Sequence, residues 1–331
     1  MAEAPASAPA SPADAPARQG CTVRAPAKIN LHLEVLGLRP DGFHELAMVM
    51  QTLDLADRLR IRPRSDGMLQ LRCDRPGLPT GADNLILQAA QALRQRCGGP
   101  ALGADIELEK RIPVGAGLAG GSSDAAAALV GLDAAWGLQR PAEELLELAA
   151  ALGSDVPYCL VGGTRLCFGR GEVLEDAGVG VPPLGVLLIK HPDAQVSTPW
   201  AYRRFRDLRE DYYLQAEADF ERRREALRRG ALLRALASGT AFPPLRNDLQ
   251  QPVAAEVESV ATGLTLLGRC QQALAVAMSG SGPSLYALFP TPEQAGRARG
   301  ELAGELAAAG FESWCCRCTG SGATLEPPED R

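Results

Sequence analysis

A glycine-rich stretch that runs straight into an alanine-rich one constrains this chain more than any other feature of its sequence. Residues 113–124 read PVGAGLAGGSSD, and residues 125–130 read AAAALV. Glycine has no Cβ, so such a stretch turns tightly and lets its backbone come close to a ligand. The helix that we expect to follow directs its free N–H groups and its positive dipole end at the loop. The stretch therefore predicts an anion site, with a phosphate chain as the expected occupant.

Two familiar nucleotide motifs do not describe this loop. It is not a Walker A loop, because no Gly-Lys-Ser or Gly-Lys-Thr ends it. Residues 115–120 match the dinucleotide-binding string Gly-x-Gly-x-x-Gly, but a charged segment and Pro113 precede them instead of a buried strand. A glycine-rich turn also serves as a plain helix start, for which Ser122, Ser123 and Asp124 are good N-cap residues. The loop alone leaves both interpretations open.

Size and composition describe a globular protein of two domains. With 331 residues, the chain is long enough for two domains that each bury a core. Hydrophobic residues make up 46% and charged residues 22%, as in soluble proteins. The net charge of −6 argues against nucleic acid or an anionic membrane as a partner. No apolar run approaches the roughly 18 residues of a membrane span.

The cysteines predict a reducing compartment. Nine cysteines, an odd number scattered along the chain, indicate free thiols in a cytoplasmic protein. Cys315, Cys316 and Cys318 form a cluster, but no histidine lies near it in the sequence. A terminal strand is therefore the better interpretation of this cluster, and we expect no resident metal bound by protein side chains.

We expect four segments along the chain. Residues 1–20 are rich in Ala, Pro and Ser and are expected to be disordered, because they cannot bury enough apolar surface to fold. Residues 21–180 form an N-terminal domain and residues 181–319 a C-terminal domain. Residues 320–331 form a flexible tail.

The order of predicted elements is that of an α+β protein. Hydrophobic periodicity and end signals predict strands at 28–35, 53–62, 69–73, 106–109, 158–161 and 164–168. They also predict three helices: one from a cap at Asp83 to about residue 97, one directly after the glycine-rich loop, and one at 141–152. The second half reads as a strand at 184–190, helical sequence at 199–236 and 252–267, strands at 273–278 and 284–289, a helix at 292–309 and a strand at 311–318. This order is the split βαβ pattern of a ferredoxin-like domain. Residues 203–229 hold nine arginines and seven acids, which indicates a solvated helical face.

One lysine stands out in a chain that otherwise uses arginine. Only three of the 34 basic residues are lysines, at positions 28, 110 and 190. Lysine offers a compact ammonium where arginine offers a broad fork. Lys28 is therefore a weak pointer to a site that needs a point charge.

Six segments together resemble a known family. In order, they are 25–31 (APAKINL), 39–44 (RPDGFH), 113–124, 153–157 (GSDVP), 246–248 (RND) and 278–283 (MSGSGP). With these segments the chain resembles the GHMP kinases, and among them the members that act on 4-diphosphocytidyl-2-C-methyl-D-erythritol. The resemblance spans about residues 23–318.

The resemblance implies a two-domain GHMP kinase fold. Its N-terminal domain is ribosomal-protein-S5-like, its C-terminal domain is ferredoxin-like, and the active site lies in the cleft between them. The implied activity is ATP-dependent phosphorylation of the C2 hydroxyl of 4-diphosphocytidyl-2-C-methyl-D-erythritol, giving the 2-phosphate and ADP in non-mevalonate isoprenoid precursor biosynthesis. The implied cofactors are ATP and Mg²⁺, the metal bound mainly through the ATP phosphates. The expected enzyme is a monomer or weak homodimer.

The resemblance also assigns roles to residues. Asp155 would take the proton from the C2 hydroxyl, and Lys28 would keep that carboxylate ionised and stabilise the transferring phosphoryl group. The ATP phosphates would lie in the loop of Pro113, Val114, Gly115, Ala116, Gly117, Leu118, Ala119, Gly120, Gly121, Ser122 and Ser123. One of the two serines would help to place Mg²⁺, and the sequence does not choose between them.

A cytosine pocket is the most specific implication. Asn30 would contact the substrate, Phe43 would stack on cytosine, His44 would bond to it, and Tyr202 would cover its far side. Taken singly, each has a plainer interpretation, such as a core aromatic, a surface histidine or a loop aspartate in the case of Asp155.

Two departures from the family pattern affect this assignment. The family usually has tyrosine where Phe43 stands, so a hydroxyl is missing. Ala116 and Ala119 stand where glycines are common and must tolerate glycine-like backbone conformations.

Two alternative functions are weighed against this one. A GHMP kinase for another small alcohol, such as mevalonate or homoserine, would not need the Phe43–His44 pair. A silent nucleotide-binding sensor would have lost Lys28 or Asp155, and both are present.

Overall fold

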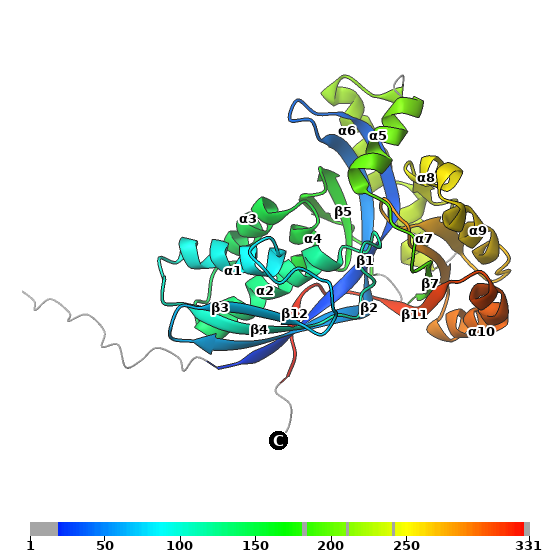
Figure 1. Cartoon of the computed structure of the whole chain (residues 1–331). Helices are drawn as coiled ribbons and strands as arrows, with labels where there is room; N and C mark the ends of the chain where they lie inside the picture. Colours follow the sequence, from blue (N-terminus) through cyan, green and yellow to red (C-terminus); the bar gives the residue numbers. More distant parts are fainter. Residues whose placement is uncertain (1–18, 181–183, 210–211, 240–241, 328–331) are drawn as a thin grey trace, which may run out of the picture.

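The computed structural model describes residues 19–180, 184–209, 212–239 and 242–327. Residues 1–20 are the predicted disordered tail, and of these residues 1–18 lie outside the described part of the chain. Figure 1 shows an α+β molecule whose first half lies around the long strands drawn in blue and whose second half lies around strands drawn from green to red.

A long antiparallel hairpin organises the first half. Its strands are β1 (Cys21–Leu38) and β2 (His44–Arg64). The turn Arg39-Pro-Asp-Gly joins them, as the sequence predicts. The other strands are β3 (Leu69–Cys73), β4 (Gly103–Glu109), β5 (Thr164–Gly169) and β6 (Val173–Asp176). Because β2 is long, β4 pairs with its second half and β5 with its first half.

Four helices cover one face of this sheet (Figure 1). They are α1 (Leu85–Arg96), α2 (Gly120–Trp136), α3 (Ala142–Leu152) and α4 (Val156–Val161). Helix α2 packs on β1 and β2 and is buried almost all round, which is why its sequence is alanine-rich and without periodicity. The glycine-rich loop therefore ends inside the protein, against the central hairpin.

The second half has the ferredoxin-like strand order that the sequence predicts. Its strands are β7 (Gly185–Lys190), β9 (Ala275–Met278), β10 (Leu285–Phe289) and β11 (Glu312–Thr319). They lie in the order β11-β7-β10-β9 and are all antiparallel. Helices α8 (Gln250–Glu256), α9 (Glu258–Leu267) and α10 (Pro292–Ala308) belong to this half, and α9 and α10 pack on the sheet.

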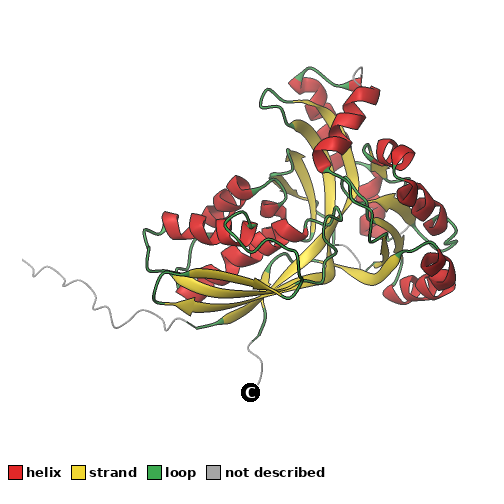
Figure 2. Cartoon of the chain, viewed as in Figure 1, coloured by secondary structure: helices red, strands yellow, loops and turns green. Residues whose placement is uncertain are grey.

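The two halves share one sheet. The end of β11 pairs with β2 at Cys318↔Leu53 and Thr319↔Thr52, so the strands form the continuous yellow band of Figure 2. A two-residue strand, β8 (Arg246–Asn247), pairs with β1. The division near residue 180 stays a prediction, because strands from beyond it pair with the first sheet.

The chain after β11 is not the flexible tail that was predicted. Thr324 and Leu325 form β12, which pairs with β1 at Arg24 and Val23. Arg58 also binds Glu326 through three hydrogen bonds, two of them at 2.9 and 3.1 Å. The prediction is wrong for residues 320–327, and residues 328–331 lie outside the described part.

Helices α5 (Thr198–Arg209) and α6 (Glu217–Arg228) form a lobe at the top of Figure 1, and α7 (Ala231–Ser238) lies lower in the same view. The tip of the hairpin lies against this lobe, where Leu214 N donates to Leu36 O. A Cβ on Gly37 would meet the Phe220 ring at 3.1 Å, so this close approach requires glycine. The contact brings the turn at 39–44 next to α5.

Local signals misplaced a few elements. The segment predicted as a strand at 158–161 is helix α4, because packing against α2 decides its conformation and overrides its β-rich composition. Asn84, and not Asp83, caps α1 by accepting from Ile86 N. The predicted helix at 252–267 is two helices that meet at Val257.

Candidate functional site

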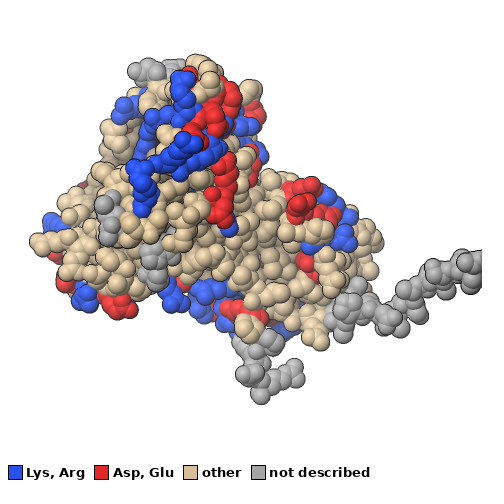
Figure 3. Space-filling model, turned by 180° about the vertical axis from the view of Figure 1, so that it is seen from behind, with Lys and Arg blue, Asp and Glu red and all other residues tan. Residues whose placement is uncertain are grey.

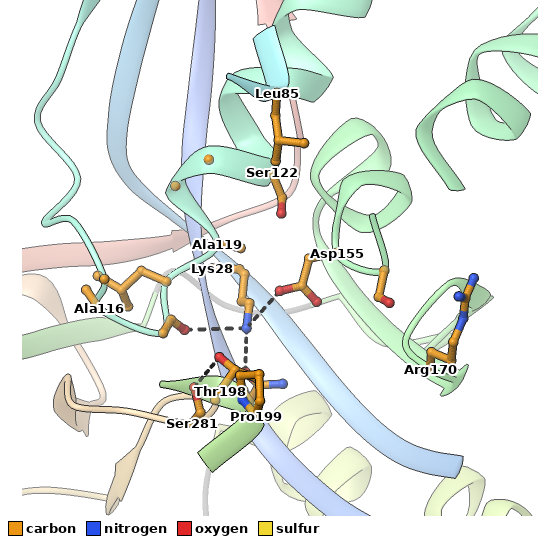
Figure 4. A pocket seen from close by; sticks show the side chains of 18 of the residues that line it. Lys28, Leu85, Ala116, Ala119, Ser122, Asp155, Arg170, Thr198, Pro199 and Ser281 are labelled. Atoms are coloured by element: carbon orange, nitrogen blue, oxygen red, sulfur yellow. Dashed lines mark hydrogen bonds and ion pairs between the residues drawn. The ribbon is translucent and has the colours of Figure 1, made fainter. Parts of the chain in front are cut away.

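A cavity of about 930 Å³ lies between the glycine-rich loop, β1, α4 and α5 (Figure 4). It contains the whole set of predicted site residues except Ser123. Residues from both halves line it, since Gly280 and Ser281 belong to the turn between β9 and β10. The predicted site residues therefore lie around one cavity.

The loop has the conformations that its glycines permit. Gly115 and Gly117 have φ of 62° and 72°, in the left-handed region. Ala119 shares this conformation with φ 56° and ψ 29°, so the expectation that it takes a glycine-like backbone is confirmed. Ala116 is not among the residues with positive φ, so the same expectation is wrong there.

The structure distinguishes the two serines of the loop. Helix α2 begins at Gly120 with Ala119 as its N-cap, so Ser122, Ser123 and Asp124 do not cap it as proposed. Ser123 is fully buried, and its hydroxyl donates to Pro26 O at 2.7 Å. The Ser122 side chain lines the cavity (Figure 4). Only Ser122 can present its hydroxyl to a ligand there.

Three buried charged side chains join the two segments that flank the glycine-rich loop. Lys110 Nζ binds Asp57 and Asp124, the latter at 2.7 Å, and all three side chains are at most 6% exposed. Asp57 Oδ1 also accepts from the backbone N of Arg111 and Ile112, at 2.5 and 2.7 Å. The cluster thus ties the chain before the loop to the helix after it.

The charges of this cluster do not balance. Two carboxylates face one ammonium, and Asp124 Oδ1 is buried without a hydrogen-bond partner among the described residues. Burial, against the pull of Lys110, raises the pKa of Asp124 from 3.8 to about 8. The sequence analysis missed this cluster. The one signal in the sequence was the scarcity of lysine, which predicted a site at Lys28 and was not applied to Lys110.

The predicted catalytic pair meets at the centre of the cavity. Lys28 Nζ lies 3.6 Å from Asp155 Oδ2 and 2.7 Å from Asn30 Oδ1 (Figure 4). Lys28 is 4% exposed, whereas the Asp155 side chain is 31% exposed. Asp155 is the N-cap residue of α4, but its carboxylate makes no capping bond. That carboxylate is therefore available to the cavity.

The turn between β9 and β10 closes over this pair. Gly280 has φ 57°, and a Cβ on it would lie 3.5 Å from both Lys28 Nζ and Asn30 Oδ1. Ser279 Oγ donates to Gly117 O at 3.0 Å, which ties the turn to the loop. Ser281 and Thr198 share a hydrogen bond of 2.9 Å. The family-like segment 278–283 thus shapes the cavity.

Aromatic side chains line the end of the cavity near α5. The His44 and Tyr202 rings are stacked, with centroids 4.8 Å apart and planes 23° apart. Phe43 is 52% exposed, and the Arg170 guanidinium lies 5.0 Å from its ring centroid. A base that stacks on Phe43 therefore takes the opposite face or displaces Arg170. His44 bonds through Nε2 to the Tyr213 hydroxyl at 2.8 Å.

Three arginines at this end were not predicted. Arg170, Arg203 and Arg206 all line the cavity. Arg170 directly follows β5 whereas Arg203 and Arg206 lie on α5, and nothing in their local pattern marks them. Together they give this end of the cavity a positive character suited to phosphate groups.

The remaining arginines of the lobe are largely paired with acids. Figure 3 shows blue and red side chains interleaved over it. Arg224 binds Glu45 and Glu217, and Arg228 binds Glu175 and Glu221. This pairing supports the interpretation of residues 203–229 as a solvated helical face over α6, whereas Arg203 and Arg206 on α5 depart from it.

Among the described residues, no three His, Cys, Asp or Glu side chains come together as a metal site would require. No helix in the same residues combines the length and the apolar character needed to cross a bilayer.

Comparison with known proteins identifies the family. Residues 84–163 match the GHMP kinases N terminal domain, and residues 219–308 match the GHMP kinases C terminal domain. A Synechococcus sp. protein named 4-diphosphocytidyl-2-C-methyl-D-erythritol kinase is 57% identical over 92% of this chain and 99% of its own length. A Prochlorococcus marinus protein of the same name is 55% identical over 92% of this chain and 95% of its own length.

Solved structures agree with this placement. A crystal structure of 4-(cytidine 5'-diphospho)-2C-methyl-D-erythritol kinase superposes with a TM-score of 0.71 at 35% identity, over 91% of this chain and 100% of that one. Homoserine kinase from Cytophaga hutchinsonii has a TM-score of 0.70 at 19% identity, over 93% of this chain and 98% of that one, which shows the shared fold alone. The chain therefore belongs to the GHMP kinase family, in the same group as these 4-diphosphocytidyl-2-C-methyl-D-erythritol kinases.

Proposed function

We propose that the protein transfers the γ-phosphoryl group of ATP to the C2 hydroxyl of 4-diphosphocytidyl-2-C-methyl-D-erythritol, a step of non-mevalonate isoprenoid precursor biosynthesis. The observation that carries this proposal is the cavity itself. One space holds the Lys28–Asp155 pair, the phosphate-type loop and a group of aromatic side chains. The names of its relatives agree with it.

Asp155 is the proposed general base. Its carboxylate is partly exposed to the cavity and makes no capping bond, so it is free to take the hydroxyl proton as the oxygen attacks phosphorus. Lys28, whose Nζ lies 3.6 Å from that carboxylate, stabilises negative charge on the transferring group. Asn30 accepts a hydrogen bond from Lys28 and so orients the ammonium. These roles suit phosphoryl transfer, which depends mostly on positioning and charge.

The loop from Pro113 to Ser123 is the proposed ATP phosphate site. Its left-handed glycines and the start of α2 direct backbone N–H groups at a bound anion. Ser122 is the serine that we place beside the phosphates, because Ser123 points to Pro26. Apolar side chains of the cavity beside the loop, including Leu78, Leu85 and Leu108, offer contacts for adenine.

The residues present fit a magnesium ion held mainly by ATP. Mg²⁺ prefers oxygen ligands and keeps several of its waters, so it needs few protein groups. The hydroxyl of Ser122 is an oxygen donor on the cavity wall. When bound, the ion would neutralise charge between the β- and γ-phosphates.

The aromatic end of the cavity is the proposed cytidine site. Phe43 and Tyr202 provide ring faces, and His44 provides a hydrogen-bonding edge. Arg170, Arg203 and Arg206 provide positive charge for the diphosphate of the substrate. Mevalonate and homoserine carry no base, so this group of residues favours the cytidylyl substrate over them.

We also propose that the enzyme works in the cytoplasm, in agreement with its nine free cysteines, and that it is a monomer or weak homodimer.

The experiment for the main proposal is product analysis. Phosphorus NMR of the reaction with ATP and Mg²⁺ should show a new phosphomonoester on the C2 oxygen. ADP formed without that signal would contradict the proposal.

A further inference from the structure

Tyr213 contacts His44 from behind the cavity wall. His44 lines the cavity, whereas Tyr213 is not among its lining residues. The two side chains are joined by the 2.8 Å hydrogen bond between His44 Nε2 and the Tyr213 hydroxyl, and their rings meet edge to face at 5.7 Å. Tyr213 therefore acts on a ligand only through His44.

The protein holds Tyr213 in place without help from a ligand. The buried ring of Phe205 stacks on Tyr213, with centroids 6.2 Å apart and planes 28° apart. The next residue back, Tyr212, donates to the buried carboxylate of Glu34 at 3.1 Å and also binds Arg246. The segment that carries the Tyr213 hydroxyl is thus anchored to α5 and β1.

The environment of His44 favours the neutral imidazole. Burial, and after it the charge of Arg206, lowers the pKa of His44 below its ordinary value of 6.5. A neutral imidazole has one N–H donor and one bare nitrogen acceptor. The hydrogen bond between His44 and Tyr213 has two possible directions, depending on the tautomer of the imidazole. When the phenol O–H donates to Nε2, the ring proton lies on Nδ1. The stack on Tyr202 fixes the plane of the ring, so Nδ1 is left as the one ring nitrogen for a ligand.

An Nδ1–H donor distinguishes two pyrimidines. Cytosine has a bare N3, which accepts a hydrogen bond, whereas uracil carries a proton on N3. A donor fixed at this position pairs with cytosine and opposes uracil. Selectivity built on a buried hydrogen bond is sharp, because the wrong base leaves polar groups unpaired.

We propose that Tyr213 is a positioning residue that sets the tautomer of His44 and thereby makes the site select cytosine over uracil. This role rests on the proposed function, because it requires a substrate that carries a cytosine base. It adds to that function a residue that touches neither substrate nor nucleotide.

The chain offers a matched pair of variants for the test. Tyr213→Phe removes the hydroxyl that reaches His44 and keeps the ring that stacks on Phe205. Tyr212→Phe, at the neighbouring position, removes a hydroxyl that reaches Glu34 instead. For each variant and the wild type, kcat and KM are measured with 4-diphosphocytidyl-2-C-methyl-D-erythritol and with its uridine analogue.

We expect Tyr213→Phe to reduce the cytosine preference roughly three- to tenfold, the size of one net hydrogen bond. The loss should appear in KM for the cytidylyl substrate, with kcat nearly unchanged, because the reacting groups are untouched. Tyr212→Phe should keep the wild-type preference. An unchanged preference in Tyr213→Phe, or an equal loss in both variants, contradicts the role of Tyr213.

Nitrogen NMR provides a readout independent of turnover. The signals of His44, assigned with a His44→Gln variant, should show the Nδ1–H tautomer in the wild type and a shift toward Nε2–H in Tyr213→Phe. The same tautomer in both proteins contradicts the inference. A wild type that turns over only alcohols without a base contradicts the proposed function itself, which is a different result from an unchanged preference.

Discussion

Lys28 and Asp155 meet across the cavity although they come from different layers of the fold. Lys28 is on the central strand β1, and Asp155 stands at the start of the short helix α4. Their charged atoms are 3.6 Å apart, and only the carboxylate has substantial access to the cavity. The lysine is thus a fixed charge, and the aspartate is the member of the pair that can reach a substrate.

Asp155→Asn should lower kcat by roughly a hundred- to ten-thousandfold, because general-base catalysis contributes about that much. The affinity for a non-hydrolysable ATP analogue should stay nearly the same, since the loop that binds phosphates is separate from Asp155. ADP release and isothermal titration calorimetry measure the two quantities. Asp193→Asn, at an exposed aspartate outside the cavity, is the control. An unchanged kcat in Asp155→Asn would rule out the assignment.

Much of this site could be predicted because its motifs are local. The glycine-rich loop carries its signal within a dozen residues, and Lys28 and the Gly-Ser-Asp-Val-Pro segment gain theirs from motifs in the order found in the GHMP kinases. The strand order of the second half followed from the order of its elements. Local signals are reliable where burial and periodicity agree.

The residues that were missed depend on contacts between distant segments. Tyr213 acquires its role from His44, and Lys110 from Asp57 and Asp124. The conformation of α4 is decided by its packing on α2, and the pairing of β12 with β1 joins the two ends of the fold. The spacing of residues within one sequence segment does not predict contacts between distant segments.

Lys110→Met should lower the free energy of unfolding by about 3–5 kcal/mol. The change leaves Asp57 and Asp124 buried and facing each other without a cation, which is the costly way to break a buried ion pair. Lys190→Met is the control, because Lys190 is also buried but bonds to two backbone carbonyls. Denaturant unfolding measures both. A loss in Lys110→Met no larger than in Lys190→Met would show that the cluster is not the support of the loop.

The stability of the protein should depend on the protonation of Asp124. Its folded pKa of about 8 lies above the unfolded value of 3.8, so the folded state holds more protons between these values. This contribution to stability is fully present below pH 3.8 and is lost as the pH rises through about 8. The Asp124→Asn variant lacks it. The free energy of unfolding of Asp124→Asn minus that of the wild type should therefore rise from pH 4 to pH 8. A difference that does not change with pH would contradict the raised pKa of Asp124.

Ala119→Gly should stabilise the protein by roughly 0.5–1 kcal/mol. An L-residue in the left-handed region costs about 1–2 kcal/mol, which glycine avoids at a smaller entropic cost. Ala116→Gly, in the same loop but outside that region, should destabilise by about 0.5–1 kcal/mol. Thermal unfolding of the two variants gives the signs. Equal signs would show that the backbone at Ala119 is not strained.

Phe43→Ala should raise KM for the cytidylyl substrate by roughly ten- to a hundredfold and leave kcat nearly unchanged. Stacking of a base on an aromatic ring contributes about 1–3 kcal/mol, and Phe43 takes no part in the Lys28–Asp155 ion pair. Phe43→Tyr, which restores the usual residue of the family, should lower KM or leave it as it is. A fall in kcat alone in Phe43→Ala would mean that the ring does not bind the base.

The central claim is that this cavity phosphorylates an alcohol that carries a cytosine base. It is tested most directly by coupled ADP release with ATP and Mg²⁺, in parallel with 4-diphosphocytidyl-2-C-methyl-D-erythritol, its uridine analogue, mevalonate and homoserine. The account predicts turnover with the cytidylyl substrate, slower turnover with the uridine analogue and none with the other two. Turnover confined to mevalonate or homoserine would leave the fold and the Lys28–Asp155 pair in place and contradict the cytidine site.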